Sequence, residues 1–425
     1  MQRPRILHIF SRYGDVGGEE VCFRAITEEL RAVADVTPFV YSTAELFQSP
    51  HGALTKMRYM LRNRDVEEKL RECLRRDRYD AWIIHNTFPA MSPCVYGLAL
   101  KQSVPVIHYL HNYRAGCLNG VFYRDGSPCF SCKNGNYLPG VLHACWRGSA
   151  AYSALAAATL YKTRRMGTWN RLSSYIAVSR RQRELLIQTG IPEDKIRVIP
   201  HFIRQKTTPA GPPPPDHPRR DVLYAGRLTQ EKGVLPLVQA WERLAPPGRT
   251  LYLMGDGPLR GELERYVAFR RLESIRLTGF IPHEEQGAVR AACGLAVAPS
   301  LWEETFGMVV LESWLHGTPV IVTPAAACRS SSATAGTAGL PGNLPRTRWR
   351  KRCAPPWRKR NAGRPWARTG SSSCPPRILP PHGFSPWAAF LRNSASSVNP
   401  PTSRHHEMVH LHSRSLQRGP HLLFP

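Results

Sequence analysis

The strongest chemical pattern in the chain is a pair of glutamates within residues 300–320. Glu304 and Glu312 are separated by seven residues, and Phe306-Gly307 after the first glutamate is expected to open a helix. The free backbone N–H groups and positive dipole end of a helix can hold an anion. Glu304 would lie in the loop at this N-terminus. Glu312 would lie along the helix, where a carboxylate accepts hydrogen bonds from sugar hydroxyls; an acidic cap and a solvated glutamate are the alternative.

Four cysteines form a second pattern, in a glycine- and asparagine-rich stretch over residues 112–148 that shows no helical period. They follow the spacing C-x11-C-x2-C-x12-C and are Cys117, Cys129, Cys132 and Cys145. Cys-x2-Cys flanked by two further cysteines can form a closed tetrahedral Zn²⁺ site that clips a long loop together. Four incidental thiols or paired disulfides are the alternatives. Cys22, Cys73 and Cys293 are expected to be small buried hydrophobic residues.

Two polar motifs follow strand-like runs in the first half of the chain. Gly17-Gly18 follows the first apolar run and lets a ligand approach the backbone closely, although a plain turn is the alternative. His111 ends a later run, at the carboxyl edge where open α/β sheets bind ligands. A core histidine is the alternative there, and His85, which ends an earlier run, has the weaker claim.

The elements that must position these residues are short apolar runs that alternate with helical segments. Such runs suit parallel sheets covered on both faces. Strands are expected at Ile6–Phe10, Ala81–Ile84, Val104–Leu110, Tyr175–Val178, Ile196–Ile199, Asp221–Ala225, Leu251–Met254, Ile275–Leu277, Leu295–Ala298 and Pro319–Val322, and a helix at Glu19–Val33. The fold class predicted is α/β, with two doubly wound Rossmann-like domains.

The alternation stops twice along the chain. Thr207–Arg220 contains six prolines and is expected to be an extended linker. This places an N-terminal domain at residues 1–205, a linker at 206–220 and a second domain at 221–324. Residues 325–425 show no sustained period.

The net charge of +27 at first favours a nucleic-acid partner, but its distribution argues against one. Residues 325–425 hold 16 Lys and Arg residues and one acid, so +15 of the excess lies in less than a quarter of the chain. A basic nucleic-acid-binding protein with a zinc module remains the rival interpretation. The paired glutamates and the two α/β halves do not favour it.

The segment around Glu304 resembles the retaining nucleotide-sugar glycosyltransferases of family 4, which have the GT-B fold and the signature Glu-x-Phe-Gly-x4-Glu. The resemblance extends over roughly residues 5–324. Its other motifs are Gly17-Gly18-Glu19, His85-Asn86-Thr87-Phe88-Pro89, His111-Asn112-Tyr113-Arg114, Ala225-Gly226-Arg227-Leu228, Glu231-Lys232-Gly233, Gly255-Asp256-Gly257-Pro258 and Gly279-Phe280-Ile281. The motifs of the N-terminal half fit a subgroup of this family.

The resemblance implies a nucleotide diphosphate sugar as donor and a hydroxyl acceptor, on a glycan, a lipid-linked sugar or a small molecule. Arg227 and Lys232, in the loop that Gly226 opens, would meet the negative charge on the leaving phosphate, so that no catalytic metal is required.

It also implies the roles of the remaining residues. Glu304 would contact the donor sugar and Glu312 the ribose, while the backbone at Phe306–Gly307 helps to hold the donor. Ile281 would border the base. His111 would contact donor sugar or acceptor, and Gly17-Gly18 would approach the diphosphate or the acceptor.

Our hypothesis for the atypical C-terminal stretch is a shift of the reading frame near Ala325–Ala326. Residues Ala327–Ala335 can be back-translated so that the frame one nucleotide earlier reads Gly-Leu-Pro-Glu-Leu-Ile-Arg-Asp-Gly. That phrase follows the last strand in the family that the chain resembles. The stretch 325–425 is therefore expected to be a disordered, non-native tail, and an inactive truncated relic is the second rival interpretation.

The chain has no apolar run of about 18 residues and no signal-peptide pattern at its start, so it is expected in the cytoplasm. A basic group in the first half would either touch the inner face of an anionic membrane or form a solvated helix face. Its members are Arg58, Arg62, Arg64, Arg75 and Arg76.

Overall fold

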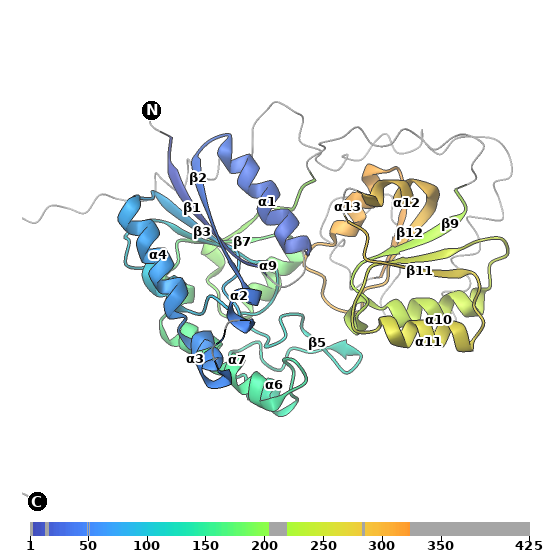
Figure 1. The fold of residues 1–425 in the computed structure, drawn as a ribbon, viewed down its shortest axis with the longest axis horizontal. Coiled ribbons are helices and arrows are strands. Elements are labelled where there is room, and N and C mark those ends of the chain that lie inside the picture. Colours follow the sequence, from blue (N-terminus) through green and yellow to red (C-terminus); the bar gives the residue numbers. More distant parts are fainter. Residues whose placement is uncertain are drawn as a thin grey trace, which may run out of the picture.

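The computed structural model describes residues 3–12, 17–48, 50, 52–203, 219–282 and 285–323. Figure 1 shows two α/β units, the first drawn in blue to green and the second in yellow to orange. Most of the predicted linker and the whole stretch 325–425 lie outside the described residues. The boundaries of these two segments therefore stay predictions.

The N-terminal unit is built on a six-stranded parallel sheet with the order β2-β1-β3-β4-β7-β8. Its strands are β1 Arg5–Arg12, β2 Asp35–Ser42, β3 Ala81–Ile84, β4 Val106–Tyr109, β7 Ser174–Ala177 and β8 Ile196–Val198. The central strands are buried along their length, as in β3, where all four residues are inaccessible or nearly so. Continuous burial explains why apolar runs revealed these strands.

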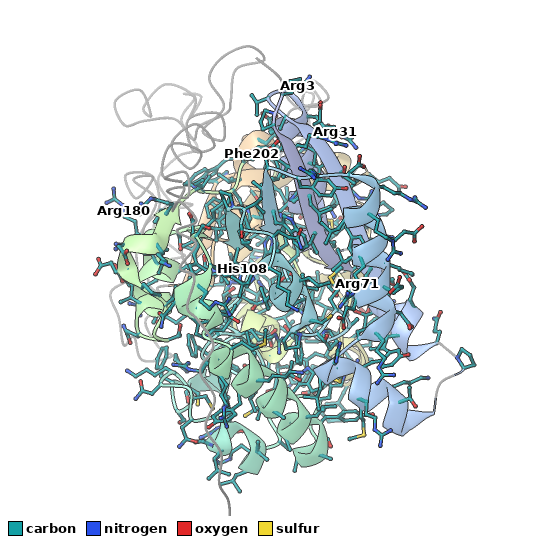
Figure 2. The ribbon with its side chains drawn as sticks, turned by 90° about the vertical axis from the view of Figure 1, so that its left-hand side faces the viewer. Arg3, Arg31, Arg71, His108, Arg180 and Phe202 are labelled. Carbon is teal, nitrogen blue, oxygen red and sulfur yellow. The ribbon has the colours of Figure 1, made fainter. Side chains whose placement is uncertain are left out.

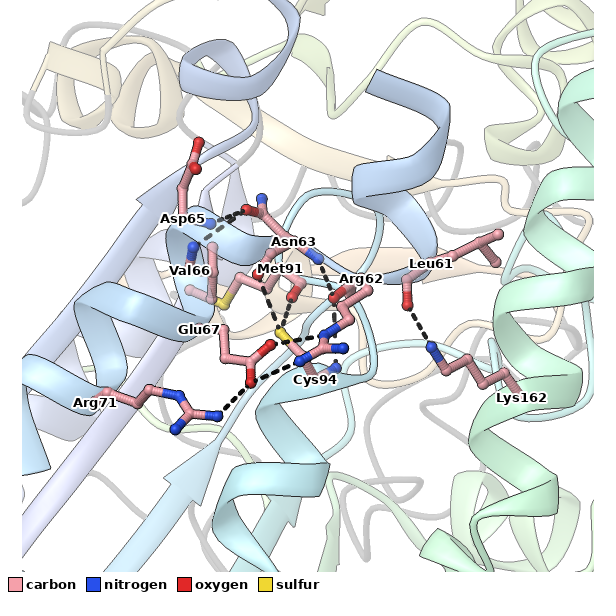
Figure 3. A network of polar contacts seen from close by, with 11 residues as sticks. Leu61, Arg62, Asn63, Asp65, Val66, Glu67, Arg71, Met91, Cys94 and Lys162 are labelled. Atoms are coloured by element: carbon pink, nitrogen blue, oxygen red, sulfur yellow. Dashed lines mark hydrogen bonds and ion pairs between the residues drawn. The ribbon is translucent and has the colours of Figure 1, made fainter. Parts of the chain in front are cut away.

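Helices cover both faces of this sheet (Figure 1). They are α1 Gly18–Arg31, α2 Thr43–Phe47, α3 Ala53–Leu61, α4 Arg64–Arg76, α5 Cys94–Ala99, α7 Ala150–Arg165, α8 Thr168–Arg171 and α9 Arg180–Ile187, with the 3-10 turn η1 Glu193–Lys195. In α4 the side chain of Asn63 accepts hydrogen bonds from the N–H groups of Asp65 (3.0 Å) and Val66 (3.1 Å), as Figure 3 shows. This cap satisfies two helix donors and fixes where α4 begins.

The C-terminal unit has a five-stranded parallel sheet with the order β11-β10-β9-β12-β13. Its strands are β9 Asp221–Ala225, β10 Leu251–Met254, β11 Ile275–Gly279, β12 Cys293–Ala298 and β13 Val320–Val322. The accompanying helices are α10 Val234–Leu244, α11 Arg260–Phe269, α12 Gln286–Ala292 and α13 Met308–Leu315, with the 3-10 turn η2 Gln230–Lys232. The predicted strands all appear, with ends that move by up to two residues.

Three local predictions need correction. The strand expected at Val104–Leu110 is shorter, since β4 spans only Val106–Tyr109. The sequence did not reveal β2, because this edge strand contains Pro38 and is half exposed rather than continuously apolar. The cysteine-rich stretch was expected to lack secondary structure. It contains the hairpin strands β5 Tyr123–Arg124 and β6 Ser127–Pro128 and the helix α6 Leu138–Leu142.

Among the described residues, none of the helices combines the length and the apolar character that crossing a bilayer requires.

Candidate functional site

Loops of the N-terminal unit meet at the carboxyl edge of its sheet, where β1, β3 and β4 end. The Glu19 carboxylate joins them, because it accepts hydrogen bonds from the side-chain amides of Asn86 (2.7 Å) and Asn112 (3.3 Å). Burial raises the pKa of Glu19, while the two amides and the charges of Arg114 and Arg227 act in the opposite direction. The ring of Tyr113, two residues after His111, meets the ring of Trp302 in the C-terminal unit, with centroids 6.4 Å apart, so the two sheet edges face one another here.

Gly17 and Gly18 stand at the start of α1, beside this edge. Both are exposed, and a Cβ atom added to either would meet nothing within 4 Å. Gly17 has an extended backbone that any residue can adopt. The protein's own packing therefore does not require these glycines, and open space lies in front of them. The predicted close approach of a ligand to this backbone stays a prediction.

His111 lies two positions after β4, at the predicted edge, and its side chain contacts another histidine. Its Nε2 atom is 2.7 Å from Nδ1 of His85, and Nε2 of His85 is 2.6 Å from Nε2 of His8. Burial lowers the pKa of His111 and of His8 to about 3 and that of His85 well below its usual value. The sequence analysis missed His8, whose one signal is a histidine inside an otherwise apolar strand.

A cavity of about 50 Å³ adjoins this edge of the N-terminal unit. Its lining includes Asn86, His108, His111, Asn112 and Arg114. Figure 2 shows His108 near the middle of the unit and Arg180 at its periphery. The N-terminal edge thus offers a small recess whose polar lining combines histidines and amides with hydroxyl groups and the guanidinium of Arg114.

On the C-terminal unit, Lys232 and Glu304 form an ion pair. The Lys232 Nζ atom is 2.9 Å from each carboxylate oxygen of Glu304. Ser300 Oγ (2.8 Å) and Trp302 Nε1 (3.1 Å) donate to the same carboxylate, which is buried. Two residues that the sequence predicted separately are therefore parts of one arrangement.

The loop after β9 carries Arg227 and needs glycine at a defined place. Gly233 has φ +70°, and a Cβ atom there would lie 2.1 Å from the carbonyl oxygen of Pro299. This close approach brings the Lys232 turn against the loop that holds Glu304. Arg227 is largely exposed and lies 3.6 Å from Glu231, so its guanidinium remains reachable. Gly226 precedes it at the end of β9.

Glu312 lies on α13, as predicted, but its carboxylate forms an ion pair with Arg290, which is buried. Arg290 also donates to the side chain of Gln286 (2.9 Å), so the pair ties α12 to α13. Burial lowers the pKa of Arg290. The predicted contact of Glu312 with a ribose stays a prediction, and the structure adds a packing role. Ile281 lies after β11 and packs against the cluster that includes Val310.

The segment from Ser300 to Gly307 also contacts the N-terminal unit. Ser179 Oγ donates to the backbone carbonyl of Thr305 (2.7 Å). Arg181 binds Glu303 through two hydrogen bonds of 3.0 Å and 2.9 Å, and this raises the pKa of Arg181. The sequence analysis missed this contact, because the partners are 122 residues apart.

Phe306 and Gly307 complete this segment. The Phe306 ring meets His201 edge-on, with ring centroids 5.1 Å apart. Gly307, with φ +85°, is the residue before α13. The helix N-terminus that was expected after Phe306-Gly307 is therefore present, next to residues of the N-terminal unit.

Two family-level sequence models match this chain. One, described as "Glycosyltransferase Family 4", matches residues 16–206, and the other, "Glycosyl transferases group 1", matches residues 219–341. Together they cover both α/β units. The chain belongs to glycosyltransferase family 4.

The family 4 assignment agrees with similar proteins of known name. The chain is 42% identical over 100 residues to "2-deoxystreptamine glucosyltransferase" of Streptomyces kanamyceticus, which is 23% of this chain and 26% of that protein. The chain thus spans about a quarter of the length of the first curated relatives that it matches.

Solved structures resemble this family 4 chain in fold. Sucrose-phosphate synthase from Thermosynechococcus elongatus has a TM-score of 0.55 and 19% identity, over 77% of this chain and 83% of that one. Anabaena Alr3699/HepE in complex with UDP-glucose has a TM-score of 0.51 and 18% identity, over 82% and 88%. The predicted arrangement of two doubly wound domains, the GT-B fold, is confirmed.

The cysteine-rich stretch of this family 4 chain gathers all four of its thiols. Cys117, Cys129, Cys132 and Cys145 form no disulfide bonds and line one cavity of about 10 Å³. Burial, aided by the other three cysteines, raises the pKa of Cys132 to about 11. In the part of the chain that the structure describes, no group of three or more His, Cys, Asp or Glu side chains is arranged to hold a metal ion. The zinc site stays a prediction.

The other cysteines mostly behave as expected. Cys22 and Cys293 are buried, whereas Cys73 is half-buried against the N-terminal core.

The basic group on α3 and α4 is largely balanced by acids. Arg62, Arg75 and Arg76 each form an ion pair with a glutamate of α4. Such pairing favours the solvated helix face over a membrane-binding surface, and membrane contact stays a prediction.

Proposed function

We propose that this chain is a retaining glycosyltransferase that moves a sugar from a nucleotide diphosphate to a hydroxyl acceptor. The observation that carries the proposal is the pair of facing sheet edges. One edge presents Lys232, Glu304 and Arg227, and the other presents Glu19 within a ring of amides and histidines. We assign the donor to the edge with the exposed Arg227 and the acceptor to the edge with the histidine-lined recess.

The C-terminal edge supplies positive charge where the leaving group develops negative charge. Arg227 is exposed and Lys232 follows it in the same segment between β9 and α10, so in this proposal both meet the diphosphate. The N-terminus of α13, which follows Gly307, adds backbone donors and the positive end of a helix dipole. In this proposal these groups supply the charge stabilisation, and no catalytic metal is required.

Glu304 positions the donor sugar in this proposal and does not attack it. Its carboxylate accepts hydrogen bonds from Lys232, Ser300 and Trp302, all within 3.1 Å. Three donors stabilise the charge and so reduce the nucleophilicity of the oxygens. We therefore assign no protein nucleophile. The acceptor hydroxyl attacks from the side on which the phosphate leaves, and the phosphate takes the proton.

The acceptor occupies the N-terminal edge, where Gly17, Gly18 and His111 border open space and the 50 Å³ cavity. Acceptors in this proposal are glycans, lipid-linked sugars or small molecules that carry a hydroxyl group. The glucosyltransferase from Streptomyces kanamyceticus that matches 100 residues of this chain supports the reaction class.

The test is donor binding by the full chain, followed by product analysis. Titration calorimetry with UDP-, GDP-, ADP- and dTDP-linked hexoses is expected to show binding of at least one donor. Proton NMR of the product should then show the anomeric configuration of the donor. Absence of binding across all four nucleotides, or inversion at the anomeric carbon, would contradict the proposal.

A structural zinc ion in the cysteine-rich stretch is a second part of the proposal. Its support is that the four thiols of residues 117–145 line one small cavity. Thiolate coordination would require the sulfur atoms to move closer and the thiols to lose their protons.

Metal analysis of the full chain, purified in reducing and chelator-free buffer, is expected to give about one zinc per chain, which a thiol reagent releases. A zinc content near zero would remove this proposal. As a matched control, Cys73→Ser is expected to leave the zinc content unchanged and Cys132→Ser to abolish it.

We also propose that the reading frame changes near Ala325–Ala326. The support is the atypical composition of residues 325–425, with 16 basic residues and one acid. The coding sequence across codons 320–340 decides the matter. If the alternative frame there does not encode Gly-Leu-Pro-Glu, the proposal falls.

A further inference from the structure

A row of three buried histidines leads from the site edge into the N-terminal core. His111 stands at the edge, His85 lies behind it, and His8 lies in the middle of β1. The ring nitrogens are 2.7 Å apart between the first two and 2.6 Å apart between the last two. The row ends on α1, where Nδ1 of His8 is 2.9 Å from Oγ1 of Thr27.

Thr27 fixes the position of every proton in this row. Its hydroxyl donates to the backbone carbonyl of Phe23 (2.8 Å), so its oxygen is left to accept a hydrogen bond from Nδ1–H of His8. A neutral imidazole carries one N–H group, and Nε2 of His8 must then accept from Nε2–H of His85. By the same rule, Nδ1 of His85 accepts from Nε2–H of His111.

This assignment leaves Nδ1 of His111 as a hydrogen-bond acceptor. Within the described residues, nothing in the protein forms a hydrogen bond with that nitrogen. The residue is 8% exposed and lines the cavity beside Asn86 and Asn112. A hydroxyl group bound in this recess can therefore donate to it.

We propose that Thr27, His8 and His85 are positioning residues that hold His111 in its Nε2–H form, so that Nδ1 accepts a hydrogen bond from a substrate hydroxyl. This inference rests on the proposed function, because that function places the substrate against His111. Aromatic rings pack along the row, among them those of Phe23 and Tyr109.

The row also defines what His111 does not do. A proton taken up at Nδ1 could pass to His85 and His8 only if Thr27 accepted it at the end. The threonine hydroxyl binds a backbone carbonyl, which cannot keep a proton. Burial, which lowers the pKa of His111 to about 3, acts in the same direction. His111 therefore accepts a hydrogen bond and does not serve as the base that deprotonates the acceptor.

The experiment is ¹⁵N NMR of the full chain labelled at its histidine rings, with the His111 signals assigned by their loss in His111→Asn. The expected result is a protonated Nε2 and an unprotonated Nδ1 at His111. Thr27→Val removes both the hydroxyl donor and its oxygen, which makes the reversed proton order available, so mixed ring signals are expected. Thr27→Ser keeps the hydroxyl and should reproduce the parent spectrum.

Kinetics supply a second readout. Thr27→Val is expected to raise KM by about fivefold, the effect of one hydrogen bond, while Thr27→Ser stays within about twofold of the parent. A parent spectrum with the proton on Nδ1 of His111, or identical ring signals in the Val and Ser variants, would overturn the inference. If the Thr27→Val variant does not fold, the protonation of His111 in the parent spectrum is sufficient to test the inference. The spectra do not depend on turnover, so failure of the proposed function is recognised separately, by the absence of transfer in the parent.

Discussion

The two facing sheet edges both hold polar groups in fixed positions, but they do so with different kinds of contact. At the N-terminal edge, three histidines contact one another through their rings, and the amides of Asn86 and Asn112 donate to the Glu19 carboxylate. At the C-terminal edge, opposite charges pair directly, as Lys232 does with Glu304 and Arg290 with Glu312. Neutral groups select partners by direction, whereas charges bind strongly over longer distances. The proposed function places an uncharged hydroxyl acceptor on the first side and a diphosphate on the second.

The largest effect is expected when charge is removed from the C-terminal edge. Lys232→Ala and Glu304→Gln should each lower kcat by about 10²- to 10³-fold, or roughly 3–4 kcal/mol, as for the loss of one preorganised group near developing charge. Steady-state kinetics in a version with the restored reading frame measures this loss, and circular dichroism checks the fold. The matched control is Lys101→Ala, at an exposed position in the turn that follows α5 of the N-terminal unit. Parental turnover in both site variants would show that the charged edge is not the donor site.

A second effect, on stability, is expected from the histidines of the N-terminal edge. Burial lowers the pKa of His8 and His111 to about 3 and that of His108 to about 4. Below pH 6.5 the unfolded chain takes up protons that the folded chain refuses, so the stability is complete above that pH and is lost as the pH falls toward 3. Each such histidine contributes a slope of about 1.4 kcal/mol per pH unit in this window.

Urea unfolding followed at pH 7.5, 6.5 and 5.5 measures this loss. The midpoint is expected to fall with acidification, and His143→Gln, at an exposed histidine, should leave the pH dependence unchanged. A urea midpoint that is constant between pH 7.5 and 5.5 would show that the buried histidines do not make the stability of the protein depend on pH.

The sequence was informative where a structural feature is local. β3, β9 and β10 have the predicted bounds, because a buried parallel strand is a short continuous apolar run. Glu304, Lys232 and His111 could be singled out because each sits in a compact motif directly after a strand. The edge strand β2 gave no such signal, since one side of it has no partner strand.

The sequence was silent where two distant segments meet. The pairs His8–His85 and Arg181–Glu303 are separated by 77 and 122 residues, and nothing in either local pattern names the other partner. The same holds for Arg290, which turns Glu312 from a free carboxylate into half of an ion pair. The order of the strands in each sheet brings these distant residues together, and a local sequence pattern does not contain that order.

One short segment holds Glu304 and also contacts the N-terminal unit, through Thr305 and Glu303. Because Glu303, Glu304 and Thr305 are consecutive in the chain, this segment links Glu304 directly to the N-terminal unit. A hinge motion that separates the halves must break the Ser179–Thr305 hydrogen bond or pull on the backbone next to Glu304. The angle between the halves and the position of Glu304 are therefore coupled, and a ligand that favours one position of Glu304 is expected to favour one angle between the halves.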